Sequence, residues 1–243
     1  MTRLLAFAGP SLTPADRAAR PDVEWRPPAQ AGDMLRLVGE GGPGRILCLI
    51  DGYFDHRPAV RHKELLLLLA RGMSVYGAAS IGALRAAEMR TFGMAGVGAI
   101  FAAYARGTLT GDDEVALVHA GAERDWRPLS VPLVDVRATL CAARRARIIG
   151  ARDARAMLRA AGAIHYVDRQ WQDICRAVVP ERRLAFEAWL RTGAVSQKRI
   201  DALACLDAAV KGEWSAHDAP AMVRTCFVDA LARECGVDPA LIG

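Results

Sequence analysis

Residues 45–82 read RILCLIDGYFDHRPAVRHKELLLLLARGMSVYGAASIG, and they hold the pattern that decides the fold. After its first residue, the run Arg45–Ile50 is apolar throughout, which is typical of a parallel strand buried on both faces. A helix is predicted over Pro58–Arg71, because proline fits the first helical position and Gly72 fits the end. Met73–Ala78 predicts the next strand. Strands and helices that alternate at this spacing indicate βαβ units and a parallel sheet.

The same alternation extends to both sides of this stretch. Strands are also predicted over Arg3–Gly9, Val23–Arg26 and Glu114–His119. Further helices are predicted over Thr13–Ala19, Ala31–Val38, Ser80–Arg90 and Ala95–Arg106. We therefore expect an α/β fold with a Rossmann-like, open and mostly parallel sheet in the N-terminal half.

Beyond about residue 133 the composition shifts toward Ala, Arg and Leu with helical periodicity. Helices are predicted over 133–148, 151–162, 166–178, 181–192, 196–210 and 220–235. We expect an α/β core domain over residues 1–135 and an all-helical C-terminal region over residues 136–243.

Composition narrows the class of protein. The longest strongly apolar stretch, Leu65–Ala70, is far shorter than a membrane helix, and the N-terminal apolar run is too short for a secretory signal. The six cysteines form no CxxC pair and no zinc-type spacing. We expect a cytoplasmic protein in a reduced compartment, with no structural metal and no cofactor; a thiol nucleophile is the less favoured alternative.

The net charge of +5 is unevenly distributed, and most of the basic surplus lies in the C-terminal half. It includes Arg144, Arg145, Arg147, Arg152, Arg155 and Arg159. Such a surplus could steer an acidic protein partner, or it could simply form solvated helix faces. The interleaved aromatic residues of a single-strand nucleic-acid binder are missing, so no nucleic-acid partner and no membrane partner are expected.

Ser80 follows the small residues Gly77, Ala78 and Ala79 at a predicted strand-to-helix turn. This arrangement resembles a nucleophile elbow, although Ala78 stands where the Gly-x-Ser-x-Gly pattern has its first glycine. Ser80 could instead act only as the N-cap of the following helix. The backbone N–H groups of the turn Gly77–Ala79 and Ile81 could bind an anion or a developing oxyanion in either case.

Further polar residues lie where the predicted strands lead into the predicted helices. His62 is a candidate general base, with a structural histidine as the alternative. Arg85 and Glu88 lie three residues apart on one helix face, and they could form an ion pair or let Arg85 hold a carboxylate-like substrate. Lys63 is a second candidate cation, while Tyr53 and Glu64 are candidate supporting residues.

Two acidic positions could support this site. Asp51 at a strand end could orient His62 or hold a cation, or it could be a turn residue before Gly52. The cluster Asp112–Glu114 could be turn chemistry, a Mg²⁺ or Ca²⁺ site, or a contact for Arg85. Glu114 is taken as a supporting residue.

A series of motifs resembles the TfuA-like family in both order and spacing. These motifs are DGYF (51–54), PAV (58–60), HKELL (62–66), VYGAASIGALRAAEM (75–89), FGMAGVGAIFAAY (92–104) and DDEVALVH (112–119). The likeness continues through RPLS (127–130) and DVRAT (135–139), whereas the last hundred residues carry no motif of this kind.

The resemblance implies a partner of a YcaO-type enzyme, which uses ATP to activate a peptide amide so that sulfur replaces its oxygen. TfuA-like proteins are associated with supplying that sulfur by hydrolysing the thiocarboxylated C-terminus of a ThiS-like carrier protein. The products would be ribosomally made modified peptides or, in methanogens, a methyl-coenzyme M reductase subunit. The Ala- and Arg-rich composition favours the peptide products of a bacterium.

For this reaction we expect Ser80 to act as the nucleophile or to position water, with His62 as the base. Lys63, Arg85 and the N–H groups near Ser80 would hold the anionic carbonyl end, while Asp51, Glu88 and Glu114 would orient them. The alternatives are a non-catalytic docking or escort protein that recruits the carrier or peptide to YcaO, and a serine hydrolase of small esters. The oligomeric state is open, with a homodimer as one alternative.

Overall fold

A computed structural model describes residues 4–40, 44–54, 57–212 and 225–242. Contacts divide the chain into two compact units, one formed by Met1–Thr110 with Ile200–Gly243 and the other by Gly111–Arg199. The predicted domain boundary near residue 135 stays a prediction.

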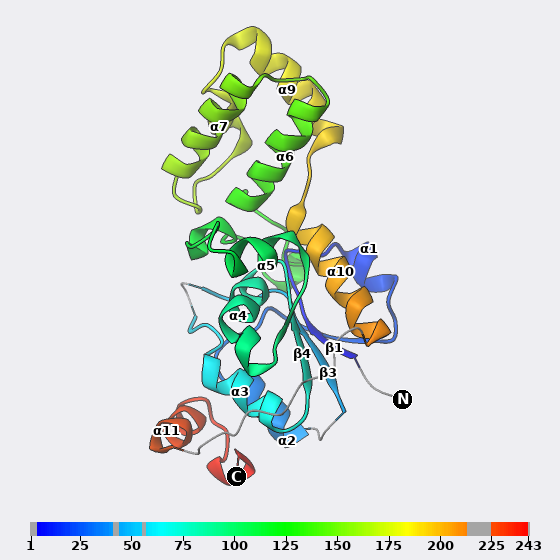
Figure 1. Ribbon diagram of the computed structural model, residues 1–243, viewed down its shortest axis with the longest axis vertical. Coiled ribbons are helices and arrows are strands. Elements are labelled where there is room, and N and C mark those ends of the chain that lie inside the picture. Colours follow the sequence, from blue (N-terminus) through cyan, green and yellow to red (C-terminus); the bar gives the residue numbers. More distant parts are fainter. Residues whose placement is uncertain (1–3, 41–43, 55–56, 213–224, 243) are drawn as a thin grey trace. The chain divides into compact units, whose positions relative to one another are not determined.

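The first unit is built on a parallel sheet with the strand order β2-β1-β3-β4-β5 (Figure 1). Its described strands are β1 (Leu4–Phe7), β2 (Val23–Arg26), β3 (Ile46–Leu49), β4 (Ser74–Gly77) and β5 (Ala95–Gly96). In the register, Leu4 lies opposite Val23 on one side and Ile46 on the other. The predicted α/β fold with a parallel sheet is confirmed.

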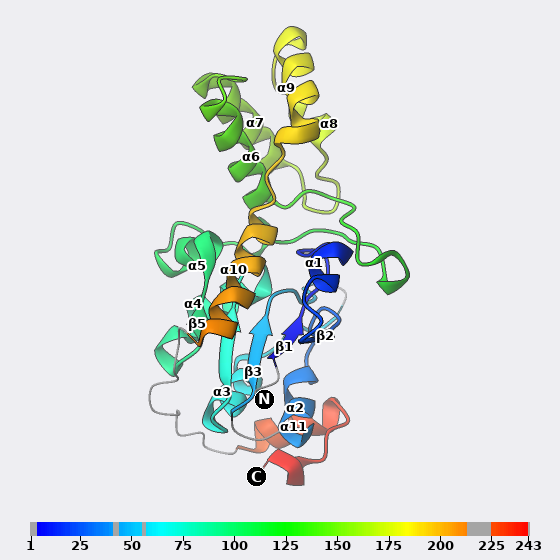
Figure 2. The ribbon, with the colours of Figure 1, turned by 90° about the vertical axis from the view of Figure 1, so that its right-hand side faces the viewer.

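Helices cover both faces of this sheet (Figures 1 and 2). Leu5 and Phe7 of β1 point into a core shared with α2 (Asp33–Glu40), α3 (His62–Ala70), α4 (Ile81–Met89) and α11 (Cys226–Glu234). Leu4 and Ala6 point to the opposite face, where α10 (Gln197–Lys211) covers them. The short α1 (Pro14–Ala18) follows β1, and α5 (Gly98–Ala105) packs against α4.

Helix α4 approaches the end of β3 closely because Gly82 has no side chain. A Cβ atom at Gly82 would collide with the carbonyl oxygen of Leu49, and one at Gly77 would collide with the carbonyl oxygen of Gly82. The Gly82 N–H also donates to the carbonyl oxygen of Ile50 at 3.3 Å. These contacts fix the turn that carries Ser80 against the ends of β3 and β4.

The predicted helix over Pro58–Arg71 begins later, at His62. The carbonyl oxygen of Pro58 accepts the Ala31 N–H at 2.8 Å, and that of Val60 accepts Nε of Arg85 at 2.9 Å. These tertiary hydrogen bonds use carbonyls that a helix starting at Pro58 would need for itself. The prediction that this helix begins at Pro58 was therefore wrong.

The predicted strand over Glu114–His119 is not formed. A 3₁₀ turn, η2 (Asp112–Glu114), opens the segment, and His119 makes a single bridge with Pro128. The hydrogen bonds beside this bridge run from the Ala120 N–H to the Arg127 carbonyl and from the Leu129 N–H to the Val118 carbonyl, and the chain then turns at η3 (Ala122–Arg124) instead of continuing as a strand. A smaller correction concerns the predicted helix Ala95–Arg106, which begins with β5 and becomes helical only at Gly98.

The second unit is helical and has its own core. It contains η3 (Ala122–Arg124), α6 (Leu133–Arg145), α7 (Ala151–Ala163), α8 (Trp171–Cys175) and α9 (Pro180–Gly193). Leu140, Met157 and Phe186 are buried together at its centre. The buried guanidinium of Arg169 donates to the carbonyl oxygens of Ala161 and Ile164 and so satisfies the C-terminal end of α7.

The predicted C-terminal helices are confirmed, and α6 ends at Arg145, three residues before the predicted end at 148. Helix α8 is shorter than the predicted 166–178, because the Arg169 carbonyl accepts the Val131 N–H and the Arg169 side chain turns to α7. Residues 220–224 of the last predicted helix lie outside the described residues, and α11 is described from Cys226. Among the described residues, no helix has both the length and the apolar character to cross a membrane.

Candidate functional site

The predicted site residues of the first unit lie mostly around the carboxyl ends of β3 and β4. The strand order places β2 and β3 on opposite sides of β1, so the topology switches direction between β1 and β3. Ligands of open α/β sheets bind at such a switch point. Asp51 follows β3 and Ser80 follows β4, so both lie at this edge of the sheet.

Asp51 is 1% exposed, and its carboxylate ties the loop after β1 to the end of β3. Oδ2 accepts the backbone N–H groups of Gly9 and Ser11, both at 2.9 Å, and Oδ1 accepts the Ser11 hydroxyl at 2.6 Å. These bonds give Asp51 a positioning role at the switch point. Ser11 was not among the predicted site residues, although its place just after the first predicted strand was the available signal.

Ser80 occupies the N-cap position of α4, is 2% exposed, and makes no side-chain capping hydrogen bond. Its N–H donates to the carbonyl oxygen of Ala78 at 2.7 Å, which closes a tight turn around Ala79. Ala79 has a φ of 65°, in the left-handed region that costs a non-glycine residue about 1–2 kcal/mol. The strain of a nucleophile elbow therefore falls on Ala79, one residue before the predicted nucleophile.

The same turn was predicted to bind anions through its backbone. The N–H of Ala78 donates to the Leu49 carbonyl, and the N–H of Ser80 is used by the turn itself. The N–H groups of Ala79 and Ile81 are the remaining candidates to bind an anion. They lie at the start of α4, which is nine residues long.

His62, Arg85 and Glu88 form a cluster between the start of α3 and the last turn of α4. His62 Nε2 lies 2.8 Å from Glu88 Oε2, and Arg85 Nη1 donates to the same oxygen at 2.6 Å. The His62 side chain is 49% exposed, so a large substrate can reach the imidazole. A carboxylate that binds one ring nitrogen orients the imidazole, as in hydrolase triads. We call these three residues the His62 cluster.

The His62 cluster is displaced from Ser80 along α4. Glu88 comes eight residues after Ser80, which corresponds to about 12 Å of helix. His62 Nε2 is engaged by Glu88, so the structure brings together His62, Arg85 and Glu88 as one group and places Ser80 in a buried turn.

Lys63 and Tyr53 lie outside this cluster. Lys63 Nζ donates to the Thr225 hydroxyl at 3.1 Å and lies 5.3 Å from the centre of the Phe227 ring, so its side chain contacts the start of α11. The guanidinium of Arg57 lies over the Tyr53 ring, 4.6 Å from the ring centre. Both residues contact groups other than the three cluster members.

Glu64 is fully buried and links the starts of two helices. Its carboxyl group accepts the Gly32 N–H at 2.7 Å and the Arg61 N–H at 3.1 Å. Burial raises the pKa of Glu64 from 4.5 to about 7, because desolvation outweighs these two hydrogen bonds. Among the four consecutive polar residues 61–64, Glu64 is the buried one.

Glu114 belongs to the other compact unit, where Arg137 binds it with both ends of the guanidinium. Arg137 Nε donates to Oε2 at 2.9 Å and Nη2 donates to Oε1 at 2.6 Å. This pairing raises the pKa of Arg137. Arg137 lies in the DVRAT motif but was not singled out from the sequence. Among the described residues, no three His, Cys, Asp or Glu side chains are grouped as a metal site requires.

Comparison with known proteins gives one family. Residues 51–170 match the family model described as TfuA-like protein, and this range contains Asp51, the His62 cluster, Ser80 and Glu114. No curated protein matches the chain.

Proposed function

Because this chain belongs to the TfuA-like family through residues 51–170, we propose that it supplies sulfur to a YcaO-type enzyme that makes peptide thioamides. Membership in this family links the chain to YcaO-type thioamidation. The finer proposal is that the protein hydrolyses the thiocarboxylated C-terminus of a ThiS-like carrier and releases sulfide.

The observation that carries this proposal is the His62 cluster. It offers an exposed imidazole, a carboxylate that orients it, and a guanidinium on the same carboxylate oxygen. Hydrolysis of an anionic acyl group needs a base to activate water and a cation to hold the anion. His62 and Arg85 supply these two functions within the part of the chain that matches the family.

The proposed reaction converts a thiocarboxylate and water into a carboxylate, hydrosulfide and a proton. His62 removes a proton from water, the water oxygen bonds to the carbonyl carbon, and the C–S bond breaks as sulfur leaves as hydrosulfide. Glu88 stabilises the imidazolium that forms in this step. Arg85 is anchored through Nε to the Val60 carbonyl at 2.9 Å, which steadies its guanidinium beside the anion.

Ser80 remains the predicted nucleophile or water-positioning residue. A nucleophile must be reachable by the carrier tail, whereas the Ser80 residue is almost fully covered. Ser80→Ala separates the two roles. Loss of sulfide release with an unchanged melting temperature supports a chemical role, while retained release leaves the attack to water activated by His62.

The test is to incubate the purified full chain with thiocarboxylated carrier in the absence of YcaO and to follow the carrier's mass. Replacement of sulfur by oxygen is expected, and His62→Gln should slow it by about 10²- to 10⁴-fold, the usual contribution of a general base. His165→Ala is the matched control, because it removes an exposed imidazole that contacts only the tilted ring of Tyr166 among the described aromatic side chains and lies in the other unit.

Two results would count against this proposal. Equal rates for His62→Gln and the wild-type chain would remove His62 from the mechanism. No change in the carrier's mass with the wild-type chain, together with measurable binding of the carrier, would favour the docking or escort function instead.

A further inference from the structure

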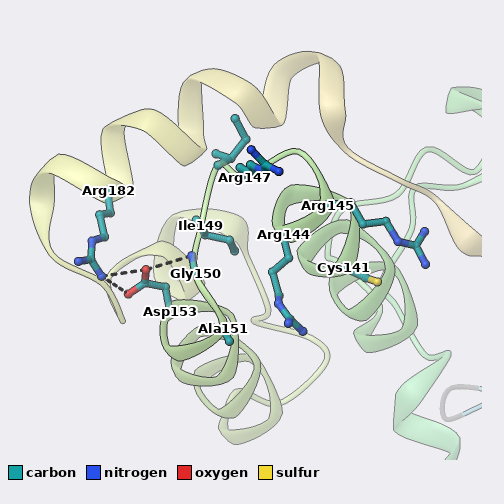
Figure 3. Close-up of a pocket in the computed structure, with 10 residues that line it drawn as sticks. Cys141, Arg144, Arg145, Arg147, Ile149, Gly150, Ala151, Asp153 and Arg182 are labelled. Atoms are coloured by element: carbon teal, nitrogen blue, oxygen red, sulfur yellow. Dashed lines mark hydrogen bonds and ion pairs between the residues drawn. The ribbon is translucent and has the colours of Figure 1, made fainter.

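The helical unit contains a pocket that the proposed reaction does not use. Its volume is about 770 Å³, within the range of ligand sites in proteins (Figure 3). Its basic lining residues are Arg144, Arg145 and Arg147 at the end of α6 and Arg182 in the first turn of α9. We call this the arginine pocket.

The charges of the arginine pocket are not balanced from within the protein. Its one lining carboxylate, Asp153, accepts Nη1 of Arg182 at 2.8 and 2.9 Å. Arg144, Arg145 and Arg147 are exposed, and no carboxylate in the described part of the chain pairs with them. Three uncompensated guanidinium groups within four residues repel one another, and an anionic ligand would relieve that repulsion.

Backbone strain at Arg147 is a second, independent observation. Arg147 has a φ of 59° and follows α6 at the position where helices favour glycine. The Ile148 N–H donates to the Ala143 carbonyl at 2.9 Å and the Arg147 N–H to the Arg144 carbonyl at 3.1 Å, which is the pairing of a Schellman motif. At this left-handed position, arginine makes the folded protein less stable than glycine would. It also places a guanidinium on the wall of the pocket.

The arrangement of the guanidinium groups indicates the shape of the ligand. Figure 3 shows Arg182 and Arg145 at opposite ends of the pocket, with Arg144 and Arg147 between them, and the four groups do not converge on one point. A single phosphate needs convergent donors, whereas an extended chain with several carboxylates suits donors that are spread out. Ile148 and Ile149 add apolar surface to the same lining. We propose that the arginine pocket binds an extended acidic peptide segment of a partner protein.

The proposal is tested by fluorescence anisotropy with the full chain and a labelled peptide of alternating glutamate and leucine. The glutamine counterpart of this peptide should not bind measurably. Arg144→Gln and Arg147→Gly should each weaken binding roughly five- to tenfold, because each removes a charge-assisted contact. Arg159→Gln is the matched control, since it removes an exposed charge from α7 outside the pocket and should change affinity less than twofold.

Arg147→Gly separates binding from folding. Glycine relieves the left-handed strain, so this variant should have a higher melting temperature while it binds the peptide more weakly. An unchanged affinity in Arg144→Gln and Arg147→Gly, or equal binding of the glutamine peptide, would overturn the proposal. Inorganic tripolyphosphate that binds more tightly than the acidic peptide, with the same loss in both variants, would also overturn it and assign the pocket to phosphate ligands.

Discussion

Glu88 Oε2 lies 2.8 Å from His62 Nε2, so a single carboxylate oxygen joins the first residue of α3 to the last turn of α4. The same oxygen accepts Nη1 of Arg85 at 2.6 Å. The contact is therefore a structural link between two helices and a means of orienting a candidate base. These two roles predict different consequences when Glu88 is changed.

Glu88→Gln keeps the size of the side chain and removes its charge. We expect the rate of sulfide release to fall by about 10- to 100-fold, because the amide stabilises an imidazolium less well than a carboxylate does. The melting temperature should change little, since ion pairs this exposed contribute about 0–1 kcal/mol. Carrier mass and thermal unfolding measure the two quantities. A large loss of stability with no loss of rate would assign Glu88 a structural role alone.

Glu64 should make stability depend on pH. Its pKa is about 7 in the folded chain and near 4.5 when exposed, so the folded state holds more protons between these values. The free energy of unfolding therefore falls as pH rises through this window, by about 3 kcal/mol in full. Urea unfolding of the wild-type chain and Glu64→Gln between pH 4.5 and 8 measures the difference. A difference that does not vary with pH would show that Glu64 does not titrate there.

Gly82→Ala should destabilise the protein by about 1–3 kcal/mol or more, because the added methyl group meets the Leu49 carbonyl oxygen. The matched control is Gly162→Ala in α7, where an added Cβ has open space within 4 Å. That change should stabilise the chain by about 0.5–1 kcal/mol, since alanine is the better helix former. Chemical unfolding of both variants gives the comparison, and the same sign for both would contradict the close approach of α4 to β3.

Strands could be predicted from the sequence where a short run of residues matched the burial that a strand of the sheet has. Val23–Arg26 and Arg45–Ile50 were predicted from short runs, and both lie in the sheet as β2 and β3. The start of α3 was not predictable, since Pro58 is a good first helical residue and only tertiary bonds to its carbonyl exclude the helix there. The pattern of Glu114–His119 predicted a strand, but 3₁₀ turns at Asp112–Glu114 and Ala122–Arg124 flank this segment, and a local apolar pattern does not reveal them.

The candidate site shows the same limit. Arg85 and Glu88 were predicted to share a helix face from their spacing, and the structure pairs them. Spacing within one helix could not show that His62 of α3 would join them. Nor could it show that Asp51 would bind Gly9 and Ser11, since these contacts connect residues about 40 positions apart.

Helix α10 has a consequence for the order in which the chain is made. One face of the sheet, with Ala6, Cys48 and Tyr76, is covered by Ala202, Cys205 and Leu206 of this helix. The ribosome completes all five strands before it reaches residue 111, and it must then synthesise the whole of the second unit before α10 emerges. During that interval the nascent sheet has one unprotected apolar face. A chain truncated at Thr110 lacks α10, so its exposed sheet face should make it aggregate or bind chaperones. A separately made α10 peptide would have to cover that face to keep the truncated chain in solution.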